Sequence, residues 1–512
     1  MITLLTLFPI VGGLAVLALS KLGDLVARAI AVTFAAGALA VAVLFWYGLD
    51  PANPGMQFEE IHAWVPALGI TYHAGVDGLG VLMLVLSALV VLMSLAASWR
   101  NENHGPAYFA LVLFLEAGLF GTFTALNFVH WFIFWELSLI PAFFLVRLWG
   151  GKGRARAAAQ FFLYTMVGSV ALLLAFLAIF LATGQFDFLH LAQLGQSGQL
   201  TTALAQNLHW SGNPEHLSML LFWAVFLGFA VKTAVVPFHT WLPATYAEAS
   251  SETTMLLTGA MSKMGVYGFL RVLLPIFPTQ MQHAMKPLLW MAVASIVLPA
   301  FAAWVQKDLK RTFAYSSINH LGYCVLGVCV AARFTGPGMA LATQKEAALT
   351  GVLLQMFSHG LTAAALFWFI ALLERRSGGL RGLEEFGGLR RVVPVFSGLM
   401  GIAIFASLGL PGLNGFPAEF LIFKGAFPLA PIASSIAVLG LLMTAVFLLT
   451  VIQKVFAGPV NPRWETMADL TLTERLALAP VIGLMFVLGL YPQLITGMVH
   501  GAVMQWVLGM RF

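Results

Sequence analysis

Long apolar segments alternate with short polar loops along almost the whole chain. A helix of about 20 apolar residues is long enough to cross the roughly 30 Å hydrocarbon layer of a bilayer. The pattern therefore predicts an all-α, polytopic membrane protein. About fourteen transmembrane helices are expected, at residues 2–20, 26–48, 76–98, 108–125, 127–148, 157–183, 218–242, 252–274, 286–305, 311–332, 346–374, 394–430, 431–457 and 476–498.

The expected twelfth helix, 394–430, is long for one span and contains the sequence LGLPGLNGFPAEF. We interpret it as a single broken helix, since two separate spans would add one to the count. The first apolar run has neither a basic leader nor a small-residue cleavage site. We therefore expect it to be a retained helix and not a signal peptide.

The composition agrees with a membrane location. Hydrophobic residues make up 60% of the chain and charged residues 9%, a balance that soluble domains do not show. The net charge of +5 comes from basic residues in short loops, which indicates membrane orientation and not nucleic-acid binding. Cys324 and Cys329 have no second cysteine pair to complete a metal or iron–sulfur site. No metal, nucleotide or covalent cofactor site is predicted.

The loop charges give the expected orientation. The two longest loops, 49–75 and 184–217, contain no lysine or arginine. Loops 1–2, 3–4, 5–6, 9–10, 11–12 and 13–14 hold 18 of the 26 basic residues: Lys21, Arg28, Arg100, Arg147, Lys152, Arg154, Arg156, Lys307, Lys310, Arg311, Arg375, Arg376, Arg381, Arg390, Arg391, Lys454, Arg463 and Arg475. The basic side is expected to be cytoplasmic, which places both termini on the periplasmic side of a cell inner membrane.

Six ionisable residues lie inside the apolar segments: Lys232, Lys263, Lys424, Glu116, Glu136 and Glu419. Each costs about 2.5–3.5 kcal/mol at the bilayer centre, so cations and carboxylates are expected to face one another along an ion path. A buried pair that only holds helices together is the alternative. Glu116 and Lys424 are possible accessory groups, which are equally compatible with a structural partner or a snorkelling side chain.

Three histidines accompany these charges: His239, His320 and His359. Each alone is more typical of a hydrogen-bonded core residue. Beside buried lysines and glutamates, however, a side chain that titrates near neutral pH is a candidate proton carrier.

Two apolar segments are interrupted by proline. VKTAVVPFHTWLP contains Pro237 and Pro243, and LGLPGLNGFPAEF contains Pro411 and Pro417. Paired breaks predict two inverted repeats around sites near the membrane midplane, here helices 4–8 and 9–13; the alternative is a simple kink. The expected organisation is three N-terminal helices (1–107), a first repeat (108–274), a second repeat (286–457) and a C-terminal helix (458–512).

Six motifs occur in order between residues 130 and 425: FWELSLIP, FAVKTAVVPFHTWLP, SKMGVYGFLR, KDLKRTFAYSSINHLGY, SHGLTAAALF and LPGLNGFPAEF. With GVDGLG at 75–80, they resemble the antiporter-like proton-channel subunits of respiratory complex I, the NADH:quinone oxidoreductase. Related subunits occur in multisubunit sodium/proton antiporters and membrane-bound hydrogenases. The chain is most similar to the M type, because M-type chains have glutamate at the position of Glu419 and lack the long lateral helix of the L type.

The resemblance implies roles for the candidate residues. Glu136 and Lys232 would form the ion pair that modulates the channel, Lys263 would be its centre, His320 and His359 its bridge, and Glu419 the terminal proton site. Movement of Glu136 away from Lys232 would release the lysine proton along this line. The chain would be a non-redox subunit of a translocase, beside L-type and N-type partners; NADH, FMN, iron–sulfur clusters and quinone would belong to other subunits.

The chain departs from the family after WLP, where the segment Ala244–Met255 lacks the usual Asp, His and Pro and contains Glu248 and Glu252. Lys424 is also unusual, and lies about 140° from Glu419 on an ideal helix. These differences are typical of a divergent copy and leave the proton entry open. The alternative functions are an ion-translocating subunit of an antiporter, hydrogenase or inorganic-carbon uptake complex, and a membrane scaffold. The choice between H⁺ and Na⁺ and the quinone also stay open.

Overall fold

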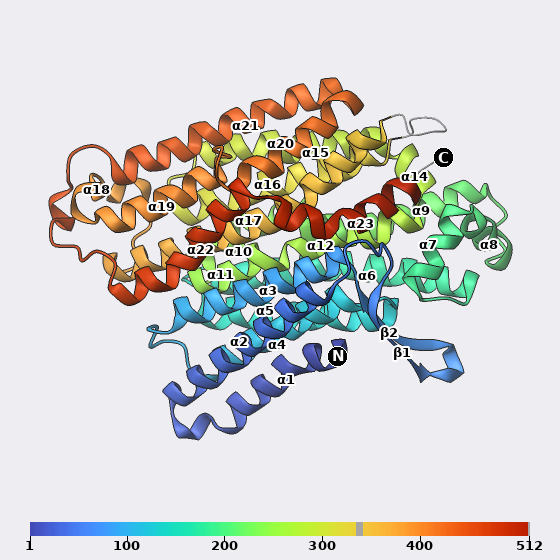
Figure 1. Ribbon diagram of the computed structural model, residues 1–512, viewed down its shortest axis with the longest axis horizontal. Coiled ribbons are helices and arrows are strands. Elements are labelled where there is room, and N and C mark those ends of the chain that lie inside the picture. Colours follow the sequence, from blue (N-terminus) through green and yellow to red (C-terminus); the bar gives the residue numbers. More distant parts are fainter. Residues whose placement is uncertain (334–340, 510–512) are drawn as a thin grey trace.

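The computed structural model describes residues 1–333 and 341–509, most of which form helices that run side by side along the long axis of the molecule (Figure 1). Residues 510–512 of the expected C-terminal segment lie outside the described residues. The first half contains α1 (Ile2–Ala18), η1 (Ser20–Leu22), α2 (Asp24–Gly48), β1 (Gln57–Val65), η2 (Pro66–Leu68), β2 (Ile70–Val76), α3 (Gly78–Ser98), α4 (Pro106–Thr124), α5 (Phe128–Trp149), α6 (Arg154–Thr183), α7 (Phe188–Gln196), α8 (Gln199–Asn207), α9 (Pro214–Thr233), α10 (Trp241–Glu248), α11 (Ser251–Leu256), η3 (Leu257–Met261), α12 (Lys263–Gly268), η4 (Phe269–Leu273) and α13 (Leu274–Ile276).

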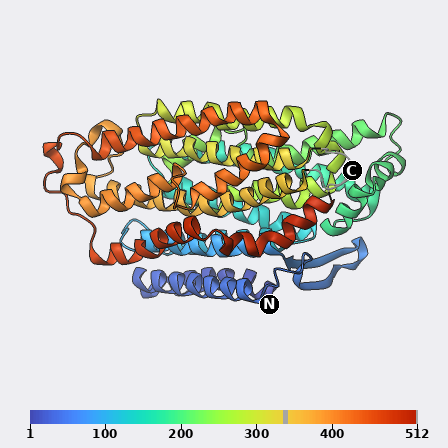
Figure 2. The same ribbon diagram turned by 45° about the horizontal axis from the view of Figure 1, so that its top comes forward.

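The second half has the same helical character and continues to the C-terminal helix α23. Its elements are α14 (Pro278–His283), α15 (Met285–Trp304), α16 (Leu309–Ala331), α17 (Ala342–Ser377), η5 (Leu383–Glu385), α18 (Leu389–Val392), α19 (Pro394–Ser407), α20 (Gly415–Leu429), α21 (Pro431–Val451), η6 (Ile452–Phe456), η7 (Pro462–Trp464), α22 (Leu472–Leu490) and α23 (Gln493–Gly509). Helices α16 and α17 are buried over nearly their whole length and form the centre, whereas α1 and α2 lie on one outer side against α3 and α4 (Figure 2).

Eleven helices among the described residues are long and apolar enough to cross a membrane. They are α2, α3, α4, α5, α6, α9, α15, α16, α17, α21 with η6, and α22. The remaining expected spans are the shorter α1 and the two interrupted segments 251–276 and 394–429. The prediction of an all-helical, multi-pass membrane architecture is confirmed, and the count of fourteen stays a prediction.

Local sequence signals start several of these helices. The side chains of Asp77, Asn127 and Asp308 accept hydrogen bonds from backbone N–H groups in the first turns of α3, α5 and α16. Proline occupies the first position of α4, α9, α19 and α21. An acceptor side chain satisfies an N–H group that has no helical partner, and proline lacks that group, so both residue types favour a helix start.

Both predicted breaks are present. Helix α9 ends at Thr233 and α10 begins at Trp241, while α19 ends at Ser407 and α20 begins at Gly415. Pro237 and Pro411 lie within the two breaks. The prediction is wrong for Pro243 and Pro417, each of which is the third residue of the following helix. A proline in the first turn of a helix displaces no hydrogen bond, so these two residues initiate helices and do not break them.

Three further expectations from the sequence are corrected. Loop 49–75 contains the antiparallel hairpin β1–β2, and loop 184–217 contains α7 and α8. The expected helix 476–498 is two helices, because Pro492 excludes the helical conformation at Tyr491 and separates α22 from α23. The expected helix 252–274 is interrupted by the π-helical turns η3 and η4.

The two ends of the bundle differ as the loop charges predict. The β1–β2 hairpin and α7 meet at one end, where His73 contacts Asp187. The backbone of Ile2 donates to Glu60 in β1, and Gly509 lies beside Gln196 of α7, so the first and last described helices also reach this end. The opposite end carries the basic loops. Helix α9 starts from the hairpin end and α19 from the basic end, so the two broken helices run in opposite directions.

Candidate functional site

Lys263 is the centre of the buried polar residues. It follows the π-helical turn η3, begins α12 and is fully buried. Its Nζ donates to the carbonyl oxygen of Thr258 at 2.5 Å and lies 2.8 Å from Nδ1 of His359 on α17. The lysine and the imidazole are therefore within range of direct proton transfer.

His359 faces His320 of the neighbouring helix α16, with 5.2 Å between the ring centroids. Nε2 of His320 lies 3.1 Å from Oγ of Ser407, at the end of α19. Its Nδ1 lies 3.2 Å from Nε2 of Gln355 and 3.2 Å from Oε1 of Glu419. His320 can thus accept from Gln355 when neutral and donate to Glu419 when protonated.

Sequence reasoning missed Gln355 and Ser407. Gln355 precedes His359 by four residues on α17, and residues at that spacing share one helix face. This spacing is the signal that identifies Gln355. Ser407 has no comparable signal, because it reaches His320 only through the end of α19 at the break.

Glu419 lies in α20 just after the second break and is 5% exposed. On its inner side is a small cavity, in which the centre of a water molecule has about 10 Å³ to occupy. The cavity is also lined by His320, His359 and Ser407. That is room for about one water. On its outer side is an apolar groove of about 490 Å³ between α20 and α21. Glu419 therefore separates the buried line from the outside of the bundle.

The predicted direct ion pair between Lys232 and Glu136 is not present. Nζ of Lys232 lies 4.7 Å from the ring centre of Trp135 and 3.4 Å from Oγ of Ser138. Oε1 of Glu136 is buried and has no hydrogen-bond partner among residues 1–333 and 341–509. Trp135 and Ser138 lie on either side of Glu136 in sequence, and both face the lysine. Because successive residues on an α-helix point about 100° apart, Glu136 itself lies to one side.

The two lysines are linked through α9 and α12. Ser138 contacts Lys232 and also lies 3.6 Å from Sδ of Met264, the neighbour of Lys263. A Cβ atom added to Gly265 would lie 2.7 Å from the carbonyl oxygen of Phe229 and 2.8 Å from the backbone nitrogen of Thr233. The absence of a side chain at Gly265 therefore allows the close approach of the helices that carry the two lysines.

The accessory candidates do not join this line. Glu116 is fully buried in α4, and neither of its carboxylate oxygens has a hydrogen-bond partner within the part of the chain that the structure describes. His239 lies in the first break, and its Nδ1 has no hydrogen-bond partner in the described part of the chain. Lys424 is exposed on the outer face of α20, as the 140° separation from Glu419 predicts. Lys424 is therefore excluded from the buried line.

The atypical segment Ala244–Met255 lies at the basic end and has a structural role there. Oε2 of Glu248 accepts a hydrogen bond from the backbone of Gly153 at 2.8 Å. Glu252 is buried and accepts from Nδ2 of Asn101 at 3.3 Å. The two glutamates thus connect α10 and α11 to the loops that follow α5 and α3.

The hairpin end has its own charged cluster, outside the membrane-spanning segments. Nδ1 of His73 lies 2.5 Å from Asp187, and Nε2 lies 3.1 Å from Glu59. Burial alone would lower the pKa of His73, but the two carboxylates outweigh it and raise the pKa above 6.5. A protonated His73 therefore ties the hairpin to the start of α7. Within residues 1–333 and 341–509, no three His, Cys, Asp or Glu side chains form a possible metal site.

A bundle with two opposed broken helices around a buried line of lysine, histidine and glutamate is the architecture of a membrane protein that moves ions. The family model described as NADH:quinone oxidoreductase/Mrp antiporter matches residues 125–447. The chain belongs to this family.

Curated relatives agree over most of the chain. It is 33% identical to the NADH-quinone oxidoreductase subunit M of Rhodobacter capsulatus over 98% of this chain and 95% of the relative. It is also 33% identical to subunit M of Rickettsia bellii over 89% of this chain and 86% of the relative. The F(420)H(2) dehydrogenase subunit M of Methanosarcina mazei is 33% identical over 89% and 88% of the two chains.

Solved structures have the same fold. A chain of respiratory complex I from Thermus thermophilus matches with a TM-score of 0.84 and 27% identity, over 100% of both chains. A chain of the Mrp complex from Dietzia sp. matches with a TM-score of 0.82, over 99% of both chains. At 21% identity the second likeness concerns the fold alone.

Proposed function

We propose that the chain is the proton-translocating M-type membrane subunit of an NADH:quinone oxidoreductase. The observation that carries the proposal is the unbroken line of contacts from Lys263 through His359 and His320 to Glu419. A buried line of titratable groups is costly in a membrane and is expected only where charge must move. The names of the relatives support the identity of the complex.

Protons move along this line in three short steps. Lys263 gives its proton to Nδ1 of His359. His359 and His320 exchange a proton across the small cavity, which has room for about one water between their rings. Protonated His320 then donates to Glu419 and, once neutral again, accepts from Gln355.

Lys232 and Glu136 act before this line. Trp135 provides an aromatic face for the Lys232 ammonium group, and Glu136 lies about 100° around the same helix. A rotation of α5 by about 100° would exchange one for the other. We infer that this exchange modulates the proton at Lys232, as the family resemblance implies.

The wider assembly completes the proposal. The complexes that contain the structural relatives are multisubunit, so we propose L-type and N-type membrane neighbours for this chain. NADH, FMN, iron–sulfur clusters and quinone would be bound by other subunits. The basic end is proposed to face the cytoplasm, with both termini periplasmic in the cell inner membrane.

The domain organisation is part of the same proposal, with repeats at 108–274 and 286–457. The opposite directions of the two broken helices support it. So does the packing, since α4 packs on α5 as α15 packs on α16. Helix α6 packs on both parts of the first broken helix, α9 and α10, as α17 packs on both parts of the second, α19 and α20.

The test replaces Lys263 by Met and compares proton pumping with electron transfer in membrane vesicles that contain the whole complex. Pumping per electron is expected to fall strongly, because the donor to His359 is lost. Lys424→Met is the matched control, since it removes an exposed lysine of the same membrane sector. Normal pumping by an assembled Lys263→Met complex would refute the proton path, and ²²Na⁺ uptake in the same vesicles separates H⁺ from Na⁺.

The second candidate is the corresponding subunit of a related antiporter, hydrogenase or inorganic-carbon uptake complex, which the shared fold with the Mrp complex favours. Co-purification followed by mass spectrometry distinguishes the two. Flavin and iron–sulfur subunits of an NADH dehydrogenase are expected among the partners, and their replacement by other partners would decide for the alternative.

A further inference from the structure

A cavity of about 330 Å³ lies at the basic end of the bundle, between α2, α3, α17 and α22. None of the residues of the proton line contributes to it. Small-molecule sites typically have volumes of about 300–1,000 Å³. The cavity is therefore large enough for the headgroup of a small amphiphile.

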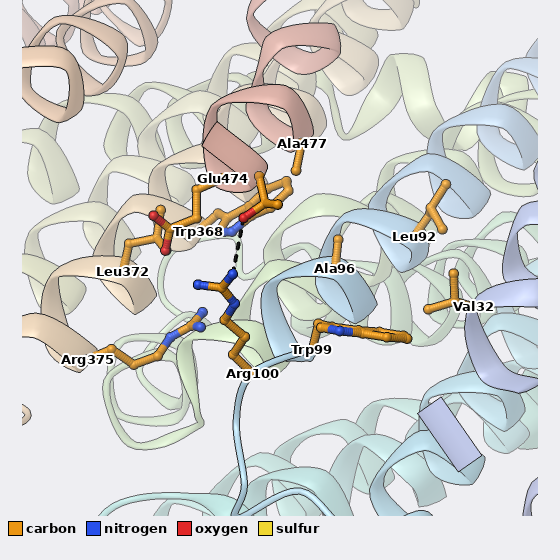
Figure 3. A pocket seen from close by; sticks show the side chains of 11 residues that line it. Val32, Leu92, Ala96, Trp99, Arg100, Trp368, Leu372, Arg375, Glu474 and Ala477 are labelled. Atoms are coloured by element: carbon orange, nitrogen blue, oxygen red, sulfur yellow. Dashed lines mark hydrogen bonds between the residues drawn. The ribbon is translucent and has the colours of Figure 1, made fainter. Parts of the chain in front are cut away.

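Two arginines enter this cavity from different helices. Arg100 follows α3 and Arg375 lies in the last turn of α17, and both side chains line the cavity (Figure 3). Arg100 donates to Oγ1 of Thr473 at 3.2 Å, and Arg375 donates to the carbonyl oxygen of Ala97 at 2.6 Å. Neither has a carboxylate within 4.0 Å among the described residues. Two adjacent cations without an acidic partner favour an anion between them.

The surroundings are also positive. Glu474 lines the cavity, but Arg376 binds it at 2.6 Å and neutralises its charge. Arg28 donates to the carbonyl oxygen of Trp99 at the cavity edge. Burial lowers the pKa of nearby His104 to about 3, and the charges of Arg28 and Arg375 contribute to this shift.

The rest of the wall is apolar. Val32, Leu92 and Ala96 lie on one side of the cavity and Trp368 and Leu372 on the other. The flanking helices α2 and α22 are apolar and largely unburied along their length, so the apolar wall continues into the bilayer. A free phosphate ion would gain no binding free energy from this apolar wall, whereas an acyl chain would gain it by burying apolar surface.

We propose that this cavity binds one anionic phospholipid of the leaflet at the basic end, with its phosphate between Arg100 and Arg375 and an acyl chain along Leu92 and Trp368. Such a lipid would join α3, α17 and α22, three helices that are far apart in the sequence. It would thus act as a structural ligand of the membrane sector, independent of the proposed proton path.

In the experiment, the complex is first equilibrated with vesicles that contain phosphatidylglycerol and phosphatidylcholine. It is then purified in detergent, and the lipid that it retains is measured. The double variant Arg100→Gln/Arg375→Gln is expected to bind phosphatidylglycerol about 30-fold more weakly, which is about 2 kcal/mol at roughly 1 kcal/mol for each basic residue. Arg390→Gln/Arg391→Gln is the matched control, because it removes two exposed arginines at the same end. The control is expected to bind like the unmodified complex.

A second variant, Ala96→Trp, fills the cavity without a change of charge and tests the site if the arginine variant fails to assemble. It is expected to lose the same lipid. Equal retention of phosphatidylglycerol by both cavity variants and the control would overturn the proposal. Equal affinity of the unmodified complex for phosphatidylcholine and phosphatidylglycerol would also overturn it, as would displacement of the lipid by inorganic phosphate. A cross-link between residue 96 and a peptide of a neighbouring subunit would show that a protein, and not a lipid, fills the cavity.

Discussion

The close contact between α9 and α12 can be tested by the substitution Gly265→Ala. The added Cβ would lie 2.7 Å from the carbonyl oxygen of Phe229 and 2.8 Å from the backbone nitrogen of Thr233. Both are backbone atoms, so no side-chain rotation relieves the contact. An ordinary contact of 3.4 Å requires the helices to separate by about 0.7 Å, the difference between 3.4 and 2.7 Å.

This separation has two calculated effects. Overpacking of a well-packed interface costs about 1–3 kcal/mol. Lys263 also lies two residues before Gly265, so a displacement of α12 by this amount alters the position of its Nζ relative to Nδ1 of His359, which now lies 2.8 Å away. Misplacement of this size in a reacting group can cost about 100-fold in rate.

The assay measures proton pumping per electron in vesicles and thermal stability of the purified complex. Gly265→Ala is expected to lower both, whereas Gly483→Ala is a control, since a Cβ there meets no atom within 4 Å. If Gly265→Ala pumps and unfolds like the unmodified complex, α9 and α12 are not held by this contact and the reasoning is refuted.

Two more predictions concern charges at the hairpin end. Asp77→Asn leaves the buried Arg271 without the carboxylate that now lies 2.5 Å away, and it is expected to destabilise the complex by about 3–5 kcal/mol in thermal unfolding. Glu384→Gln is the control, because it breaks only the exposed pair with Lys454. It is expected to change stability by less than about 1 kcal/mol. For His73 the folded-state pKa is raised, so its contribution to stability is fully present below pH 6.5 and is lost as the pH rises through the raised value. The protection of the β1–β2 amides from hydrogen exchange, measured relative to the intrinsic base-catalysed rate, is therefore expected to fall as the pH rises through that raised value. Protection that stays constant with pH, or a profile that His73→Gln leaves unchanged, would contradict this assignment.

Much of the site could be predicted because charge in a membrane is costly. Lys263, His320, His359 and Glu419 stand out in apolar segments, and the structure brings these four together. The two breaks could be predicted for a related reason, since proline and glycine interrupt otherwise continuous apolar runs.

The errors arise where a small angle or a local backbone choice decides the outcome. Glu136 was expected against Lys232, but a turn of about 100° brings Trp135 there instead. Pro243 and Pro417 look like breakers in the sequence, and only the backbone shows that each lies in the first turn of a new helix. The β1–β2 hairpin lies in a loop too irregular in sequence to predict a strand, with its register interrupted twice.

Because of the π-helical turns around Lys263, the direction of its side chain depends on the number of residues in the turn that precedes it. Such a turn closes its hydrogen bonds over one more residue than an α-helical turn. It therefore changes the direction, around the helix axis, of every side chain that follows. Removal of one residue from Leu257–Met261 would restore the α-helical phase and turn Lys263 by about 100° away from His359. A deletion within Leu257–Met261 is therefore expected to abolish proton transfer from Lys263 to His359 even where the residue removed contacts neither of them. The number of residues in this turn, and not only their identity, sets the direction of the lysine.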